Sequence, residues 1–562
     1  MVSKNGEVIL LYLLKKDSKK PSINQLSREL QISVGSAHKI LKDFEKEGVV
    51  DSEVVGNSII YSLNMENLKT RAIVSQLDQV GQFKRKKKTK IVCTIGPATS
   101  DPETIKQLIK EGMDVVRING SHGTEESNLR IINNVRKADP ALPILLDIPG
   151  KKIRLSDLEQ EMPVTKGDSF TFTTDDNNID PTKVFVPALD LHLQLKPGNR
   201  FLVDDGTIGF QVKEIKEKDI LCKVLNDGVL KSRKGLNFPD ANLSVDPISP
   251  KDIQLLHFAV EHKLNFVGVS FASNREHLQR IRGILNDAEI KVIAKIENQQ
   301  GLANYTEIID EAYGVMLDRG DLGSETAIEI VPRLQKKIIK ECNYAGKPII
   351  VATQMLDSMI SKPYPTKAEI SDVANAVLDG ATALMLSAET AVGLFPLDSV
   401  RMMTEIINNI EDQVQSTLLD TEVHVENSSD MVGKAINQIV QVAKIDKIFC
   451  LTGGGYSARM ISRHKIKVPL LVATSSTRVY QRLNLLWGVE RILLTTAVDN
   501  TNSAEQKKEA ILEALQQGLL QKDDTIIITG AVFPNNRKIT NLIEIHKVNE
   551  LLGFLTQNGD KD

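Results

Sequence analysis

From Thr89 to about residue 390, short apolar runs alternate with amphipathic segments in a regular order. The segments predict helices such as Asp101–Glu111 and Ile330–Ala345, because their apolar residues recur at helical spacing. Strands that alternate with helices in this way are typical of an α/β fold with a closed parallel barrel. The chain therefore predicts a (β/α)8 TIM barrel whose strands are Lys90–Thr94, Asp114–Ile118, Ile144–Asp147, Phe266–Phe271, Lys291–Ile296, Gly314–Leu317, Pro348–Thr353 and Ala383–Ser387.

The alternation is interrupted between the third and fourth predicted strands. Residues 156–245 are rich in Thr, Val and turn residues with short alternating segments, which predicts an inserted β lid domain. After Glu426 a second α/β pattern begins, with predicted strands Ile448–Cys450, Pro469–Ala473, Ile492–Thr495 and Thr525–Thr529. We therefore expect the barrel at 89–155 and 246–425, the lid at 156–245 and a C-terminal α/β domain at 426–562.

Length and composition limit the class of protein. At 562 residues the chain is too long for one core, and its net charge of −3 excludes a general polyanion or nucleic-acid binder. The cysteines lie far apart without a CxxC pair, which predicts reduced buried thiols in a cytoplasmic protein. No 18-residue apolar stretch occurs, so we expect no membrane association.

Residues 1–70 predict a separate module. Its predicted helices are Gly6–Lys16, Ile23–Leu30 and a third that begins at Ser33 or Ser36 and ends at Glu47. Two β-rich runs, Val49–Val55 and Ser58–Leu63, then face each other across Gly56-Asn57 as a hairpin. Three helices followed by a hairpin resemble the winged helix-turn-helix family.

In the winged helix family the third helix enters the major groove of DNA. The resemblance implies DNA contacts from four residues on the solvent face of that helix: Ser36, His38, Lys39 and Lys42. The module is only slightly basic, and winged helices also act as protein docking or dimerisation modules, so both interpretations stay open. The connector over residues 71–88 ends in a basic run, 84–88, that either holds DNA phosphates or is a solvated junction.

Polar side chains gather where the predicted barrel strands end, which is where barrel enzymes carry their chemistry. Lys295 and Glu297 stand at one such end, and Asp321 follows the next strand. An ammonium beside two carboxylates suits a divalent cation and a phosphoryl group. These runs alone would also fit an ordinary buried ion pair. A series of such ends across one barrel favours an active site, and the others are Thr94, Arg117, Asp147, Thr353 and Ser387.

From Thr89 to the C-terminus, seven motifs in order resemble the pyruvate kinase family. They are Cys93-Thr94-Ile95-Gly96-Pro97-Ala98, Arg117-Ile118-Asn119, Ser121-His122-Gly123, Lys295-Ile296-Glu297-Asn298, Arg319-Gly320-Asp321-Leu322-Gly323, Ala352-Thr353-Gln354-Met355-Leu356 and Ser371-Asp372-Val373-Ala374-Asn375-Ala376-Val377. The resemblance implies transfer of a phosphoryl group from phosphoenolpyruvate to ADP, giving pyruvate and ATP. It also implies Mg²⁺ or Mn²⁺ as the cofactor and a homotetramer.

The same resemblance implies roles for individual residues. Glu297 and Asp321 would hold the Mg²⁺, while Lys295 and Arg117 would hold the transferring phosphoryl group. The substrate would bind at Gly320, Asp321 and Thr353, and Thr353 with Ser387 behind it would shape the proton path to the enolate carbon. The nucleotide would be bound by a further set of residues, namely Pro97, Asn119, His122, Arg154, Asp205 and Lys234.

One departure from the family concerns a monovalent cation. The resemblance implies a potassium site made by Asn119, Ser121, Asp147 and Ile148. Many members carry a glutamate where this chain has Lys152, and members with lysine there tend not to need potassium. Because a tethered ammonium supplies the same charge, we expect activity without added potassium; the alternative is that Lys152 points to solvent. Lys151 also replaces the usual proline, and nothing in the sequence explains it.

Two further interpretations stay open. In the C-terminal domain, the glycine-rich loop Thr452–Ser457 lies between a strand and a helix, a context that suits either a sugar-phosphate effector or tight packing. The alternative overall function is a transcription regulator whose kinase-like body senses phosphoenolpyruvate or a nucleotide. The candidate catalytic residues are all present, and this favours an active enzyme.

Overall fold

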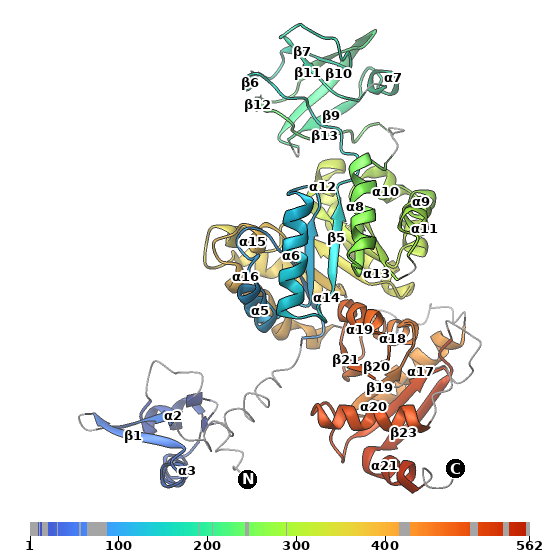
Figure 1. Cartoon of the computed structure of the whole chain (residues 1–562). Coiled ribbons are helices and arrows are strands. Elements are labelled where there is room, and N and C mark those ends of the chain that lie inside the picture. The colour runs from blue at the N-terminus through green and yellow to red at the C-terminus, as the bar shows by residue number, and fades with distance from the viewer. Residues whose placement is uncertain are drawn as a thin grey trace. The chain divides into compact units, whose positions relative to one another are not determined.

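The structure is a computed structural model. It describes residues 9–10, 12–13, 21–30, 32–55, 58–64, 87–188, 190–204, 206–241, 247–287, 289–414, 427–494, 504–531 and 539–557. The chain divides into two compact units, Met1–Lys86 and Lys87–Asp562 (Figure 1). Within the described ranges, no helix is long and apolar enough to span a membrane.

The N-terminal unit contains helices and one hairpin. Its helices are α2 (Ile23–Leu30) and α3 (Val34–Lys46), and β1 (Val50–Val55) pairs antiparallel with β2 (Ser58–Leu63). Ser33 caps α3 by accepting a hydrogen bond from the Ser36 amide, so the third predicted helix begins at Ser33 rather than at Ser36. The described residues of the first predicted helix are helical, whereas the Gly56-Asn57 turn and most of the connector lie outside the described residues.

Strands β3, β4, β5 and β14–β18 form a closed parallel barrel in the order β14-β15-β16-β17-β18-β3-β4-β5, which confirms the predicted barrel. Several predicted strand ends differ by one residue and one by two, and the backbone conformation explains two of these differences. The strand predicted to Phe271 stops at Val269, and the one predicted to Thr353 stops at Ala352, because Phe271 and Thr353 have φ of 52° and 66° and so leave the β region. The strands are β3 (Lys90–Thr94), β4 (Val115–Asn119), β5 (Ile144–Ile148), β14 (Phe266–Val269), β15 (Lys291–Ile296), β16 (Gly314–Asp318), β17 (Ile349–Ala352) and β18 (Ala383–Leu386).

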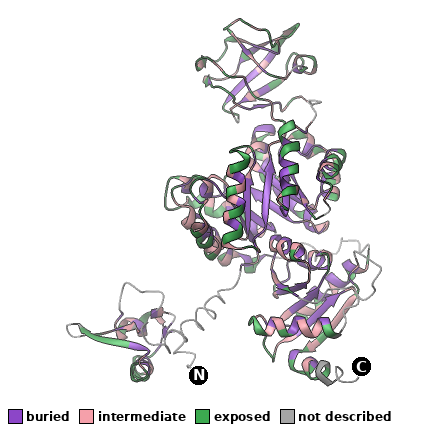
Figure 2. Cartoon of the chain, viewed as in Figure 1, coloured by how far each residue is buried: buried purple, intermediate pink, exposed green. Residues whose placement is uncertain are grey.

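Apolar side chains fill the barrel on both faces of its strands. One cluster, which includes Val92, Phe266 and Met316, is separate from the larger cluster that the strands share with the surrounding helices. The barrel strands are mostly buried (Figure 2). Side-chain caps fix several helix starts, as Asp101 does for α5. The main helices around the strands are α5 (Pro102–Glu111), α6 (Glu125–Ala138), α8 (Pro250–Glu261), α9 (Arg275–Leu285), α11 (Tyr305–Glu311), α12 (Arg319–Glu325), α13 (Val331–Tyr344), α14 (Lys367–Leu378) and α16 (Pro396–Ile410).

The residues inserted between β5 and β14 form two small sheets. The six-stranded sheet has the order β13-β9-β10-β11-β7-β8, and a second sheet pairs β12 with β6. Stacked and tilted phenylalanine rings, including Phe172, Phe201 and Phe210, make its separate core. The strands are β6 (Met162–Val164), β7 (Ser169–Thr173), β8 (Lys183–Phe185), β9 (Arg200–Val203), β10 (Ile208–Lys216), β11 (Asp219–Val224), β12 (Gly228–Leu230) and β13 (Leu236–Asn237).

The C-terminal domain is a five-stranded sheet in the order β21-β20-β19-β22-β23. Four strands match the predicted α/β pattern, although the third lies at Val489–Leu493 instead of Ile492–Thr495. The antiparallel edge strand β23 was not predicted. The elements are α17 (Ser428–Val442), β19 (Lys447–Leu451), α18 (Tyr456–Ser462), β20 (Leu470–Thr474), α19 (Thr477–Arg482), β21 (Val489–Leu493), α20 (Ala504–Gln516), β22 (Thr525–Gly530), β23 (Leu542–Lys547) and α21 (Val548–Gln557).

Hydrogen bonds join the start of the barrel to the C-terminal domain. The Lys88 carbonyl accepts from the Gly488 amide of the C-terminal domain at 2.9 Å, while the Lys88 amide donates to Glu411 Oε2 of the barrel domain at 2.8 Å. Trp487 Nε1 donates to Thr89 Oγ1 at 3.2 Å. The last residues of the basic run are therefore part of a seam between the two domains.

The four cysteines are buried and free, as predicted. Burial raises the pKa of Cys222 and of Cys450 to about 12, so these thiols stay protonated. They carry no candidate chemistry.

Candidate active site

Lys295 is the centre of a buried charged cluster at the end of β15. Its ammonium lies 3.1 Å from Glu297 Oε2, 3.4 Å from Asp318 Oδ2 and 3.5 Å from Asp147 Oδ2. It also donates to Ser270 Oγ at 3.0 Å. Burial alone would lower the pKa of Lys295, but the carboxylates raise it above its usual value. Lys295 is therefore buried and positively charged.

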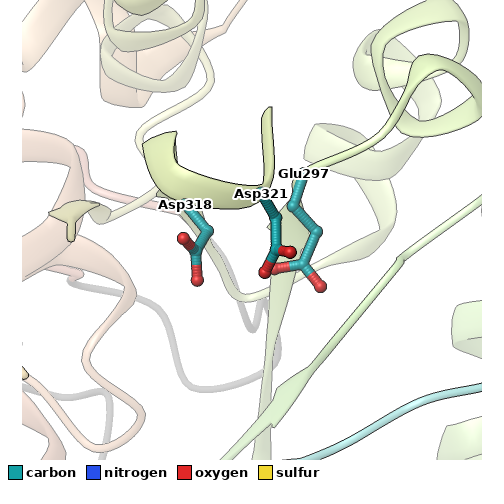
Figure 3. A group of neighbouring side chains, drawn as sticks. All are labelled: Glu297, Asp318 and Asp321. Carbon is teal, nitrogen blue, oxygen red and sulfur yellow. The ribbon is translucent and has the colours of Figure 1, made fainter. Parts of the chain in front are cut away.

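Three carboxylates beside Lys295 form a candidate metal site. Oxygen atoms of Glu297, Asp318 and Asp321 all lie within 4.8 Å of one another (Figure 3). Glu297 Oε2 is buried and has no hydrogen-bond partner, so it has a free lone pair inside the site. Oxygen ligands of this kind suit Mg²⁺ or Mn²⁺. The residues present therefore fit the expected divalent cation.

Asp318 was not among the predicted metal ligands. It is the last residue of β16 and stands directly before the Arg319-Gly320-Asp321 motif. Its position at a strand end was a signal that could have identified it, because Lys295 and Arg117 were recognised by their own strand ends. The structure adds Ser270 in the same way, at the end of β14.

The pKa of Glu297 is raised to about 8. Burial is the main cause, and Asp321 and Asp318 add to it, while Lys295 opposes them. The Phe271 amide donates to Glu297 Oε1 at 2.8 Å and fixes the side chain. A divalent cation that binds here displaces a proton from Glu297 below that pH.

Arg117 lies next to Lys295 and is oriented by Asp147. Its Nε and Nη2 donate to Asp147 Oδ2 at 2.9 and 2.6 Å, and Nη1 donates to Thr94 Oγ1 at 3.1 Å. Burial raises the pKa of Asp147, but Lys295 and Arg117 outweigh it and hold the pKa below its usual value. A Cβ at Gly268 would lie 1.8 Å from Asp147 Oδ1, so only glycine fits beside this carboxylate.

Thr353 lies at the opposite side of the carboxylates. Its Oγ1 is 3.0 Å from Asp318 Oδ1 and accepts a hydrogen bond from the Gly320 amide at 2.9 Å. The amide expected to bind the substrate carboxylate is therefore held by Thr353 in this structure. Ser387 Oγ is buried and has no hydrogen-bond partner, so no hydrogen bond joins it to Thr353.

Lys152 does not point to solvent. Its ammonium lies 2.7 Å from Asp321 Oδ1, and its side chain is 14% exposed. Residues predicted to form the monovalent-cation site have other partners in the structure. Asp147 pairs with Arg117, and Asn119 Oδ1 accepts a hydrogen bond from the exposed Ser121 amide. Lys152 is thus joined to the candidate metal ligands rather than to Asp147 or Asn119.

The predicted nucleotide residues do not form one connected cluster. Pro97 and His122 are exposed in the loops after β3 and β4, at the same barrel end as Lys295. Arg154 donates to the Arg233 carbonyl at 3.2 Å, and Lys234 pairs with Asp204 at 2.7 Å. Asp205 lies outside the described residues.

The glycine-rich loop of the C-terminal domain is held by its own contacts. Gly455 has φ of +83°, and its amide donates to Thr452 Oγ1 at 2.9 Å. Ser457 Oγ accepts from Thr540 Oγ1 at 2.8 Å. These contacts explain the loop by packing, and they assign no effector to it.

Comparisons with known proteins cover most of the second unit. The sequence model described as pyruvate kinase, barrel domain, matches residues 86–400, and that described as pyruvate kinase, alpha/beta domain, matches residues 430–546. The chain is 38% identical over 456 residues to a pyruvate kinase of Thermococcus litoralis, covering 79% of this chain and 94% of that protein. It is 36% identical over 481 residues to a pyruvate kinase of Geobacillus stearothermophilus, covering 83% and 81%. It is 35% identical over 474 residues to a pyruvate kinase of Clostridium acetobutylicum, covering 82% and 99%.

Proposed function

The chain belongs to the pyruvate kinase family, and from this premise we propose that Lys295, with the carboxylates around it, is the centre of phosphoryl transfer from phosphoenolpyruvate to ADP. The observation that carries this assignment is the buried ammonium 3.1 Å from Glu297 Oε2, an oxygen that accepts no hydrogen bond from the described residues. Glu297, Asp321 and Asp318 would hold Mg²⁺ or Mn²⁺. The bound cation would neutralise charge on the phosphoryl oxygens and the enolate.

The protein's own cations do the rest of the charge neutralisation. Phosphoryl transfer depends mainly on positioning and on stabilising charge spread over the equatorial oxygens. Lys295 is kept charged by three carboxylates, and Arg117 presents a planar fork whose orientation Asp147 fixes. Both groups therefore meet the transferring phosphoryl group without reorganisation.

Thr353 and Gly320 are proposed to bind the other end of the substrate. When the substrate carboxylate takes the Gly320 amide, Thr353 Oγ1 is released from its 2.9 Å hydrogen bond. Thr353 would then shape the proton path to the enolate carbon, with Ser387 as the next hydroxyl along the path, while Thr353 Oγ1 still lies 3.0 Å from Asp318 Oδ1. ADP is proposed to bind across the expected set Pro97, Asn119, His122, Arg154, Asp205 and Lys234.

The test is turnover in a lactate dehydrogenase-coupled assay, together with Mn²⁺ binding followed by electron paramagnetic resonance. We expect turnover in the wild type and its loss on Glu297→Gln, with Mn²⁺ affinity lowered in the same variant. A variant that keeps full turnover would refute the assignment. We further propose that Lys152 makes added potassium unnecessary, because its ammonium already stands 2.7 Å from Asp321.

For the N-terminal unit we propose a winged helix that binds duplex DNA. The supporting observation is that α3 exposes His38, Lys39 and Lys42 on one helix, next to an antiparallel hairpin. Ser36 is half-buried, and its amide bonds to the Ser33 cap. DNA occupancy would then depend on phosphoenolpyruvate or nucleotide bound by the catalytic unit.

Selection of the full chain on random duplex DNA, with and without phosphoenolpyruvate, tests this proposal. We expect an enriched sequence whose binding weakens in Lys39→Glu. No enrichment would favour protein docking instead, for which Val54 and Ile59 offer an exposed apolar pair at opposing hairpin positions.

We also propose a cytoplasmic homotetramer. Large apolar side chains of the second unit are exposed, including Ile328, Tyr364 and Leu394. Sedimentation velocity is the direct measurement, and a monomer at micromolar concentration would contradict the proposal.

A further inference from the structure

Two chain segments join the inserted lid to the barrel, and both contact helix α12. In the outgoing segment Lys152 lies 2.7 Å from Asp321. In the returning segment Asn237, at the end of β13, donates through Nδ2 to Glu325 Oε1 at 2.7 Å. Asp321 and Glu325 are four residues apart, so they share one face of α12. The helix that carries a candidate metal ligand is therefore held by both lid connections.

The contact between Asn237 and Glu325 is almost closed to solvent. Asn237 is 1% exposed and Glu325 is 9% exposed. Burial raises the pKa of Glu325, and hydrogen bonds from Asn237 and from the Phe238 amide oppose this. Placing a carboxyl group there costs stability, since it has no ion pair at hydrogen-bond distance to offset its desolvation. A role in positioning α12 explains why the site contains one.

Glu325 also ties α12 to the strand that carries Lys295. Gln299, just after β15, donates through Nε2 to the Glu325 carbonyl at 2.8 Å. Glu297 precedes Gln299 by two residues in the same loop. One residue at the end of α12 thus contacts the lid through its side chain and the metal-site loop through its backbone.

A cavity of about 560 Å³ lies beside this contact. Lys152, Asn237, Phe271, Gln299 and Glu325 are among the residues that line it. Asn237 Oδ1 is buried and has no hydrogen-bond partner. The returning segment therefore borders this cavity, and the hydrogen bond from Asn237 to Glu325 fixes the segment to α12.

We propose that Asn237 and Glu325 are positioning residues which couple the lid to the metal site, so that Asp321 and the lid take up their places together. The proposal rests on the proposed role of Asp321 as a metal ligand. Neither residue belongs to the proposed substrate- or metal-binding set. When a cation takes the Asp321 oxygen from Lys152, the hydrogen bond between Asn237 and Glu325 keeps the lid joined to α12.

Asn237→Ala removes the hydrogen bond to Glu325 and leaves the metal ligands in place. We expect the Mn²⁺ dissociation constant and the KM for ADP each to rise about 5- to 20-fold, while kcat falls less than about threefold, as for lost binding rather than lost chemistry. Glu325→Gln keeps an acceptor oxygen for Asn237, so its constants should stay within about twofold of the wild type.

The experiment measures Mn²⁺ binding by electron paramagnetic resonance on the full chain without substrates. Hydrogen exchange at residues 236–238, with and without Mn²⁺, reports directly on the segment that returns from the lid to the barrel. We expect Mn²⁺ to slow exchange there in the wild type and not in Asn237→Ala. The matched control is Asn343→Ala, which removes a buried asparagine that bonds the Gly380 carbonyl within the barrel and has no lid contact.

Equal Mn²⁺ affinity in Asn237→Ala and wild type would overturn the inference, and so would an equal loss in Asn343→Ala, since either result means a merely structural role. Failure of the metal assignment has a different signature. In that case the wild type itself binds no Mn²⁺, and the inference falls with it.

Discussion

Lys152 and Asp321 form an ion pair of 2.7 Å between the segment that enters the lid and the helix that follows β16. Asp321 also belongs, with Glu297 and Asp318, to the group of three carboxylates that could hold a metal ion. An ammonium carried by the chain therefore stands at the edge of the metal site. Its charge is part of the site before any ligand arrives.

Lys152→Glu places a carboxylate against Asp321 and so replaces attraction by repulsion. In potassium-free buffer we expect coupled turnover to fall at least about tenfold, equivalent to about 1.4 kcal/mol. Added potassium should restore part of it, because a bound cation then takes over the missing charge. Lys151→Glu makes the same charge reversal at the exposed neighbouring residue and should have little effect on turnover. Many-fold potassium stimulation of the wild type would contradict the prediction.

Lys295→Met removes the ammonium that contacts Asp147, Glu297 and Asp318. We expect kcat to fall by about 10³ or more, the scale of losing a preorganised charge at a transferring group. The protein should also unfold more easily, since buried carboxylates lose their partner. Lys90→Met is the matched control: Lys90 is equally buried in a barrel strand but bonds the Val489 carbonyl. Turnover retained in Lys295→Met would rule out its catalytic role.

Lys465 predicts a pH effect on stability. Burial lowers its pKa to about 7 from 10.5, and its ammonium lies 5.2 Å from the Trp487 ring. Between pH 7 and pH 10.5 Lys465 is mostly neutral in the folded protein but mostly protonated in the unfolded chain. The unfolded chain therefore binds more protons, and the free energy of unfolding rises with pH. Lys465→Met should therefore stabilise the protein below pH 7, and this gain should shrink towards pH 10. Thermal unfolding across this range gives the answer, and a gain independent of pH would contradict it.

Removal of the N-terminal unit should leave catalysis intact. All described candidate catalytic and metal residues lie within Lys87–Asp562, and this unit is compact by itself. A chain that begins at Lys87 should keep kcat and the KM for phosphoenolpyruvate within about twofold, as expected when no transition-state contact is lost. DNA binding, where the full chain shows it, should disappear. A large loss of kcat would mean that the unit supports the active site.

The barrel was predictable because buried parallel strands are continuous apolar runs. The strand ends were less so, since Phe271 and Thr353 look like strand residues and adopt positive φ only in context. Strand β23 was missed because it lacks the continuous apolar run that marked the other strands, although its alternating Ile and Glu residues are the pattern of a half-buried strand.

Part of the site followed from the same logic. Lys295 and Glu297 lie at the end of one strand, and Asp321 follows the next strand. Because the carboxyl ends of parallel strands lie at the same end of the barrel, these residues were expected to lie close together. The partner of Lys152 did not follow, because it depends on how the lid segments return to α12. Asn237 and Glu325 were invisible for that reason: 88 positions separate them in sequence.

Trp487 is the only tryptophan in the chain, and its indole bonds Thr89 where the connector enters the barrel. The ammonium groups of Lys88 and Lys465 lie 5.3 and 5.2 Å from its ring. The single tryptophan fluorophore of the protein thus lies at the seam between the barrel and the C-terminal domain. Its emission spectrum gives an optical signal, without any label, for whether an event in the N-terminal unit reaches the catalytic body.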